Sequence, residues 1–175
     1  MFKFLNRKNN KGSTNITRLI QYMLLFTLFA FALDVIFLVG NLLVVGYNNN
    51  YIANKLMVQG GLIGAQSKDV NDPSGGILFY GMATNEDIIK STNKVLGMVG
   101  IGVNDWMMDV DGKRLYDAGK ANYTLKTPLQ YGDVADLTTS FRYKWRFTSG
   151  LLPGSVNMTF KKVSSFTSDY YRQSN

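Results

Sequence analysis

An almost unbroken apolar run from Leu19 to Val45 constrains the fold of this chain more than any other feature of the sequence. As a helix with a rise of about 1.5 Å per residue, the run would be roughly 40 Å long. The hydrocarbon core of a bilayer is about 30 Å thick, and about 20 apolar residues cross it. A helix that is apolar on all faces needs lipid or a large protein interior, which 175 residues do not provide. The run therefore predicts a transmembrane helix over residues 18–46.

The charges before this run are all positive, and they predict its orientation. They are Lys3, Arg7, Lys8, Lys11 and Arg18. Short basic segments stay on the cytoplasmic side of a membrane. We therefore expect a protein of the cell membrane in which residues 1–17 form a cytoplasmic tail and the chain after the transmembrane helix lies outside. The tail carries most of the net charge of +7, and we interpret it as a topology signal that also touches anionic lipid head groups. We do not interpret it as a nucleic-acid-binding arm.

The chain contains neither cysteine nor histidine. An outward domain of this kind must be stable without disulfides. The composition also removes the usual zinc sites, Cys or His nucleophiles and the Ser–His–Asp triad. These absences exclude most enzyme classes, and we expect no catalytic site and no cofactor.

Beyond the apolar run, Tyr47-Asn48-Asn49-Asn50 marks the expected exit from the membrane. Residues 47–64 are expected to extend the helix, although Gly60-Gly61 disfavours its last turn, and residues 65–175 are expected to form an outer domain. Thr84 and Asp87 have the spacing of a capping box, and apolar residues then repeat at helical spacing as far as Val99. Asp111-Gly112 lies between two short strand candidates and predicts a two-residue hairpin. These signals predict one amphipathic helix followed by antiparallel strands.

The strongest strand signal is Leu137 to Phe147, where side chains alternate between apolar or aromatic and polar over eleven residues. Val156 to Phe160 is its expected partner, and the residues from Ser164 onward show no clear period. Further predictions are a loop over Gln66–Gly76 and short strands over Ile77–Tyr80 and Tyr123–Gln130. The outer domain is therefore expected to be α+β, with the helix extension and one packing helix covering a small antiparallel sheet.

This order of parts resembles the TadE-like pseudopilins. The resemblance lies in a basic tail ending in Lys11-Gly12-Ser13-Thr14, a hydrophobic helix that continues past the membrane, and a small α/β domain. The domain closes with the pattern Phe141-x-Tyr143-x-x-x-Phe147, the turn Leu151-Leu152-Pro153-Gly154 and a final strand. The resemblance implies a bitopic, outward-facing, non-enzymatic protein of a tight-adherence pilus or a related secretion or conjugation system.

The resemblance also raises the question of cleavage by a prepilin-type peptidase between Gly12 and Ser13. Related proteins usually carry a Glu five residues after the processing site, inside the membrane. Here that position would be Thr17, with Arg18 beside it. Processing at Gly12 and an unprocessed amino terminus both stay open.

Asp34 stands near the middle of the apolar run, where an unpaired charge is costly. Such residues usually face a protein partner or a wet cavity. We therefore expect an intramembrane contact with another subunit at Asp34, helped by Gly40 and Asn41 about two turns further on. The alternative is a protonated Asp bonded to its own backbone and tolerated through helix tilt.

Arg142, Lys144 and Arg146 form a basic stripe on the polar face of the predicted strand 137–147. Such a stripe could bind teichoic acid, anionic lipid or single-stranded DNA, and the alternative is an ordinary solvated sheet face. Asp105, Asp109 and Asp111 offer oxygen ligands for calcium, but their spacing is not that of an EF-hand and favours a plain hairpin turn.

The expected function is that of a pseudopilin-like structural or assembly subunit of a pilus, secretion or conjugation apparatus. Its partners would be membrane lipid, copies of itself or homologous subunits, and inner-membrane assembly proteins. The alternative is a membrane-tethered module that binds an envelope polymer or DNA. The long helix and Asp34 favour the first, and the basic stripe favours the second.

Overall fold

The computed structural model describes residues 6–64, 83–149 and 157–170, with side chains from residue 15 onward. It has two compact units. The first comprises Met1–Leu38 and Lys144–Val156, and the second comprises Val39–Tyr143 and Asn157–Asn175. The predicted loop Gln66–Gly76, the predicted strand Ile77–Tyr80 and the motif Leu151–Gly154 lie outside the described residues. The predicted α+β class is confirmed.

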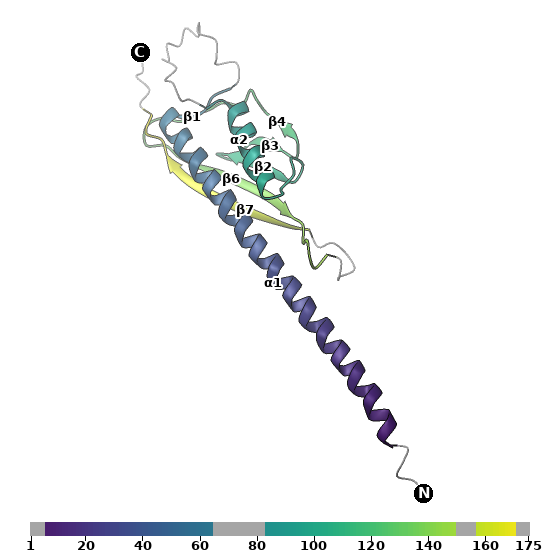
Figure 1. The fold of residues 1–175 in the computed structure, drawn as a ribbon. Helices are drawn as coiled ribbons and strands as arrows, with labels where there is room; N and C mark the ends of the chain where they lie inside the picture. The colour runs from purple at the N-terminus through teal and green to yellow at the C-terminus, as the bar shows by residue number, and fades with distance from the viewer. Residues whose placement is uncertain (1–5, 65–82, 150–156, 171–175) are drawn as a thin grey trace, which may run out of the picture. The chain divides into compact units, whose positions relative to one another are not determined.

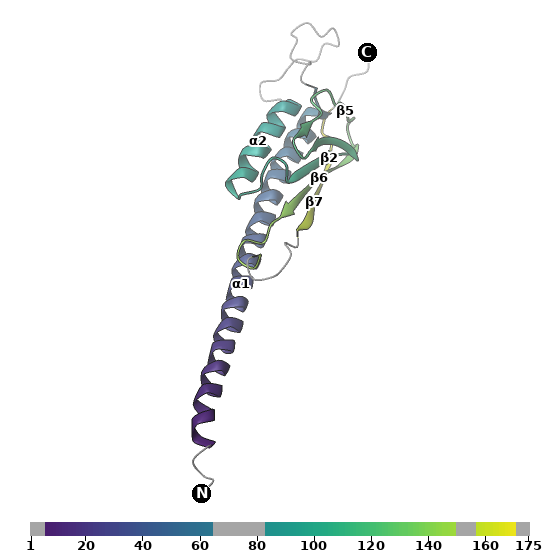
Figure 2. The ribbon, with the colours of Figure 1, turned by 90° about the vertical axis from the view of Figure 1, so that its right-hand side faces the viewer.

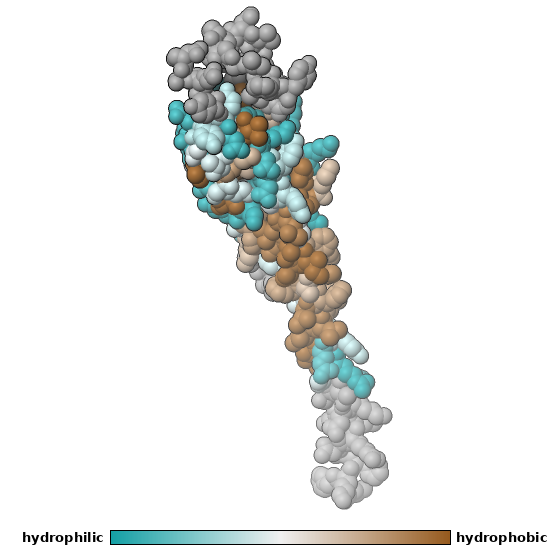
Figure 3. Space-filling view, turned by 90° about the vertical axis from the view of Figure 1, so that its left-hand side faces the viewer, coloured by the Kyte–Doolittle hydropathy of each residue, from teal (hydrophilic) through white to brown (hydrophobic). Residues whose placement is uncertain are grey.

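Helix α1 (Asn6–Gln59) begins in the first unit and ends in the second. All side chains of residues 15–29 are exposed, and Figure 3 shows the apolar side chains of this helix as a brown surface. In the described part of the chain, α1 is the helix that is long and apolar enough to cross a membrane. It ends after Gln59 instead of running to residue 64, because Gly60, one of the two glycines expected to disfavour the helix, turns the backbone to a φ of 72°.

In the second unit, five antiparallel strands form a sheet in the order β4-β3-β2-β6-β7 (Figure 1). The strands are β2 (Trp106–Val110), β3 (Lys113–Asp117), β4 (Lys120–Ala121), β6 (Val134–Tyr143) and β7 (Met158–Thr167). A separate two-stranded pair joins β1 (Gly61–Leu62) to β5 (Thr127–Pro128). The predicted strand Tyr123–Gln130 is thus reduced to two residues, since Pro128 cannot donate to a longer ladder.

Two helical segments cover one face of this sheet, and Figures 1 and 2 show them side by side. They are the last turns of α1 and helix α2 (Asn85–Met98). Ile52 and Leu56 of α1 and Leu96 of α2 are almost fully buried. From the sheet, Trp106 of β2 and Phe141 of β6 are equally buried. These residues form the core of the second unit.

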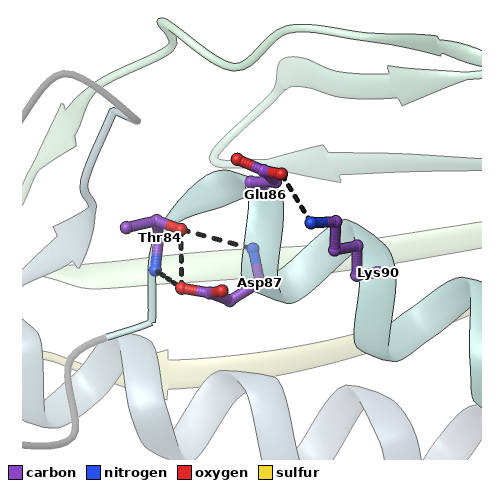
Figure 4. Close-up of polar contacts among 4 residues, drawn as sticks. All are labelled: Thr84, Glu86, Asp87 and Lys90. Atoms are coloured by element: carbon purple, nitrogen blue, oxygen red, sulfur yellow. Dashed lines mark hydrogen bonds and ion pairs between the residues drawn. The ribbon is translucent and has the colours of Figure 1, made fainter.

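The amino terminus of α2 has the predicted capping box (Figure 4). The Asp87 backbone N–H donates to Thr84 Oγ1 at 3.3 Å, and the Thr84 backbone N–H donates to Asp87 Oδ2 at 3.1 Å. On the exposed side of the same helix, Lys90 Nζ lies 2.6 Å from Glu86 Oε1. This hydrogen bond to the Glu86 carboxylate raises the pKa of the Lys90 ammonium. The cap satisfies N–H groups that the helix leaves free, so it fixes where α2 begins.

The Asp111-Gly112 hairpin is confirmed between β2 and β3. Both residues have positive φ, 50° and 71°, as a type I′ turn requires. Asp109 forms an ion pair with Arg114 across the hairpin. The described residues contain no group of three acidic side chains that could hold a metal ion.

Strands β6 and β7 differ from the sequence prediction at their ends. The alternation of buried and exposed side chains in β6 is as predicted, but the strand begins at Val134 and ends at Tyr143 instead of Phe147. Strand β7 runs to Thr167, although the pattern suggested an end near Phe160. Most side chains of its later residues are exposed, so the sequence shows no apolar alternation there, and the strand continues through its pairing with β6.

Candidate functional site

The site centres on Asp34, whose side chain is 0 % exposed although it lies in the most apolar part of α1. The segment Lys144–Ser149 of the same unit wraps its carboxyl group. The backbone N–H groups of Arg146 and Thr148 donate to Oδ1 and Oδ2 at 2.9 and 2.8 Å. The Phe147 N–H is shared between the two oxygens, at 3.2 and 3.1 Å. The Thr148 hydroxyl adds a further bond to Oδ2 at 2.8 Å.

These partners all donate, which is the arrangement a carboxylate requires because it offers acceptors alone. Successive backbone N–H groups that converge on one anion form a nest. Usually a nest holds a phosphate or another free anion, but here the anion is a side chain of the protein itself. Hydrogen bonds to a charged acceptor are worth about 1.5–3 kcal/mol each. Asp34 is therefore a strong tie between α1 and a segment more than a hundred residues later.

Aromatic side chains flank the carboxyl group on both sides. The rings of Phe31 and Trp145 stack with centroids 5.7 Å apart and planes 11° apart. Phe37 meets Phe147 at 5.8 Å, and the Arg146 guanidinium lies 5.4 Å from the Phe37 centroid. The Phe31–Trp145 and Phe37–Phe147 pairs add packing energy and hold the segment in one orientation.

The local sequence of α1 explains why this face accepts the segment. Phe31 and Phe37 lie three residues before and after Asp34, so all three side chains lie on neighbouring positions of the helix surface. One turn before Asp34, the small residue Ala30 is also buried. A small side chain there lets the incoming backbone come close to the helix.

The structure gives Asp34 partners within its own chain, but the donors come from residues 146–148 and not from the backbone of α1. The alternative of a protonated Asp bonded to its own helix does not describe this site, because the partners named above all donate to the carboxyl oxygens. Asn41 is buried in the second unit, and Gly40 has nothing within 4 Å of where a Cβ would be. The structure does not bring these two residues into the contacts of Asp34 described above. An intermolecular contact in the membrane stays a prediction.

The structure corrects the prediction that Arg142, Lys144 and Arg146 form one basic stripe. Arg142 belongs to β6, but the strand ends at Tyr143, and Lys144 and Arg146 belong to the segment that holds Asp34. The three side chains therefore do not share one strand face. The reason is that Arg146 donates its backbone N–H to Asp34 and cannot continue the β6 ladder.

Three consecutive asparagines that we assigned to the membrane exit have another role in the second unit. Asn48 donates to Thr92 of α2 at 3.2 Å, and Asn50 accepts from Ser164 of β7 at 3.0 Å. Asn49 is 0 % exposed and accepts from Thr139 of β6 at 2.7 Å. A run of asparagines inside a helix, where they are poor helix formers, was the available signal for a packing role.

Gly12 and Ser13, the candidate processing residues, fall within the backbone of α1. Processing there stays a prediction. Comparison of the chain with protein-family models, with curated proteins and with solved structures gives no match.

Proposed function

We propose that this protein is a single-pass membrane protein, with its amino terminus in the cytoplasm and its sheet domain outside. In this proposal it acts as a pseudopilin-like structural or assembly subunit of a surface pilus, secretion or conjugation apparatus. The observation that carries the proposal is α1 itself. One helix of 54 residues exposes large apolar side chains between Ile16 and Phe29 and contributes buried core residues with its last turns.

The exposed part of α1 argues for lipid and for other helices as its surroundings. Leu24, Leu25 and Phe26 are each more than 60 % exposed, and the pattern holds around the whole helix. Burying one such side chain is worth about 1.5–3 kcal/mol, so a band of this size does not stay in water. Lipid covers it in the membrane, and similar helices would cover it in an assembled apparatus.

The resemblance to the TadE-like pseudopilins adds the kind of apparatus to this argument. The polar partners of Asn48, Asn49 and Asn50 tie α1 to α2 and to both long strands. The sheet domain therefore packs on the last part of the same helix that the proposal places in the membrane. That property suits a structural subunit.

Site-specific photo-crosslinking in cells tests the proposal. A photoreactive amino acid replaces Leu24, which is 65 % exposed on α1, and the matched control replaces Tyr123, which is 45 % exposed in the second unit. We expect Leu24 adducts with a second copy or with other single-pass proteins, identified by mass spectrometry. The intact mass of the purified chain shows whether residues 1–12 are removed. A protein that stays monodisperse in buffer without detergent would overturn the proposal.

A further inference from the structure

The segment Lys144–Ser149 is exposed, irregular backbone fixed against an apolar helix. Lys144, Arg146, Phe147 and Ser149 are exposed, and Trp145 is half-buried. The hydrogen bonds to Asp34 and the ring contacts with Phe31 and Phe37 set its level along α1. The segment therefore lies at the same depth in the membrane as Asp34.

A span over residues 18–46 would bring Asp34 close to the centre of the bilayer. Irregular backbone exposed to lipid does not occur in the hydrocarbon region. A Lys or Arg at the centre of a membrane costs about 2.5–3.5 kcal/mol on insertion scales, and the segment exposes one of each. A membrane span over residues 18–46 would therefore place the segment in the hydrocarbon, where it is not stable. The span must lie closer to the amino terminus.

A shorter span fits the helix. Asn15 to Leu33 is 19 residues, or roughly 28 Å at 1.5 Å per residue, close to the thickness of the hydrocarbon core. Residues 15–29 within it are exposed throughout, so lipid can reach them. Arg18 would lie about one turn inside the cytoplasmic boundary, from where a long side chain reaches the head groups.

The residues of the segment are those that favour a membrane–water interface. Trp is enriched at that level, with its ring among the head groups. Lys144 and Arg146 alternate with the aromatic residues Trp145 and Phe147, so each cation has an apolar neighbour in the chain. Basic side chains are attracted to the phosphate groups of lipids. The segment thus has both the aromatic and the basic components of an interfacial anchor.

We propose that residues 144–149 form an interfacial foot, which rests among the lipid head groups on the outer side of the membrane and is fastened to α1 through Asp34. The membrane span is then Asn15–Leu33, and α1 leaves the hydrocarbon at Asp34 instead of near Tyr47. The partner of the foot is the bilayer surface. This inference rests on the proposed membrane anchoring.

The depth of Trp145 in a bilayer tests the foot directly. The chain has two tryptophans, and Trp106→Phe removes the buried one, so the fluorescence of the variant reports Trp145 alone. The full chain is reconstituted in nanodiscs that contain lipids brominated at a shallow, a middle or a deep acyl position. We expect the strongest quenching from the shallow label and the weakest from the deep label. Strongest quenching from the deep label, or none from any label, would overturn the foot.

Cysteine labelling separates failure of the foot from failure of the membrane anchor. Because the chain has no cysteine, each single-cysteine variant reports one position. In nanodiscs, which leave both faces open, a water-soluble maleimide should label Leu43→Cys and spare Phe26→Cys, two positions of similar exposure, 60 % and 62 %. Protection of Leu43→Cys would overturn the shorter span while leaving the anchor intact. Labelling of Phe26→Cys would overturn the anchor and the foot together.

Discussion

The Thr139 hydroxyl donates a hydrogen bond of 2.7 Å to Asn49 Oδ1, although ninety residues separate the two in the chain. Both side chains are 0 % exposed. The Asn49 amide in turn donates to the Lys162 carbonyl oxygen at 3.2 Å. Asn49 therefore links α1 to two strands of the sheet, β6 and β7.

A double-mutant cycle on this pair should show strong coupling. Thr139→Val and Asn49→Ala should each lower the free energy of unfolding by about 1–3 kcal/mol, since each leaves a buried polar group unpaired. The double variant should lose less than the sum by at least about 0.5 kcal/mol. Chemical unfolding in detergent measures these free energies. All variants carry Trp145→Phe, so that the fluorescence reports Trp106 alone. Thr138→Val, on the other face of β6, is the matched control and should be nearly neutral. Full additivity would contradict the pairing.

Removing the Asp34 carboxyl group should release the segment that it holds. In Asp34→Ala, the backbone N–H groups of Arg146, Phe147 and Thr148 lose their acceptor. We expect their hydrogen exchange to speed up by about ten- to a hundredfold, because bonds to a charged acceptor are worth about 1.5–3 kcal/mol. Amide exchange read by mass spectrometry measures it. Thr27→Val, which removes an exposed hydroxyl bonded within α1, should leave these amides unchanged. Unaltered protection in Asp34→Ala would show that other contacts hold the segment.

Two glycine-to-alanine changes in the second unit should act in opposite directions. Gly61 has a φ of 103°, and an added Cβ would meet the Thr127 carbonyl oxygen at 1.8 Å. Gly61→Ala should therefore separate β1 from β5 and cost several kcal/mol. Gly97 lies in α2 with nothing within 4 Å of the added atom, so Gly97→Ala should stabilise by about 0.5–1 kcal/mol. Thermal unfolding of the two variants measures both effects. If both unfolding temperatures shifted in the same direction, the backbone geometry described for one of the two glycines would be wrong.

Alkaline conditions should weaken the second unit through Tyr116. Burial raises the pKa of its phenol above the ordinary value of about 10. The folded state then favours the neutral phenol, so this contribution to stability is complete below the unfolded pKa and is lost as the pH rises through the folded pKa. Tyr116→Phe should be the less stable protein at pH 8, because the phenol donates to the Val103 carbonyl oxygen at 2.8 Å. Urea unfolding measures the difference in free energy of unfolding between the parent protein and Tyr116→Phe, and this difference should become smaller above about pH 10. A difference that grows above that pH would contradict a raised pKa of Tyr116.

The sequence predicted the elements that depend on neighbouring residues. The capping box of Thr84 and Asp87 and the turn Asp111-Gly112 need partners within three residues, and both formed as expected. The end of β6 could not be predicted in the same way. The alternation in the sequence runs on to Phe147, but Trp145 and Phe147 find their ring partners on α1, and Asp34 takes the backbone N–H groups. The partners of the segment lie over a hundred residues away, so no local pattern contains them.

The contacts of the asparagines at positions 48–50 could not be predicted for a related reason. Next to an apolar run they were interpreted as the point where the helix enters water. Their polar partners are Thr92, Thr139, the Lys162 carbonyl and Ser164, each at least forty residues away. A polar residue in a helix has the same local appearance whether it meets water or a buried partner. The sequence could indicate that these residues were unusual, but not what they contact.

Strand β7 stands last in the sheet, and its outer row of backbone groups would ordinarily pair with a strand from a neighbouring molecule. The side chains of Lys161 and Lys162 are exposed on this edge strand. Two copies that joined their sheets through β7 would bring these like charges together, and Lys on an edge strand discourages such pairing. Copies of this protein are therefore expected to join through other surfaces than the β7 edge.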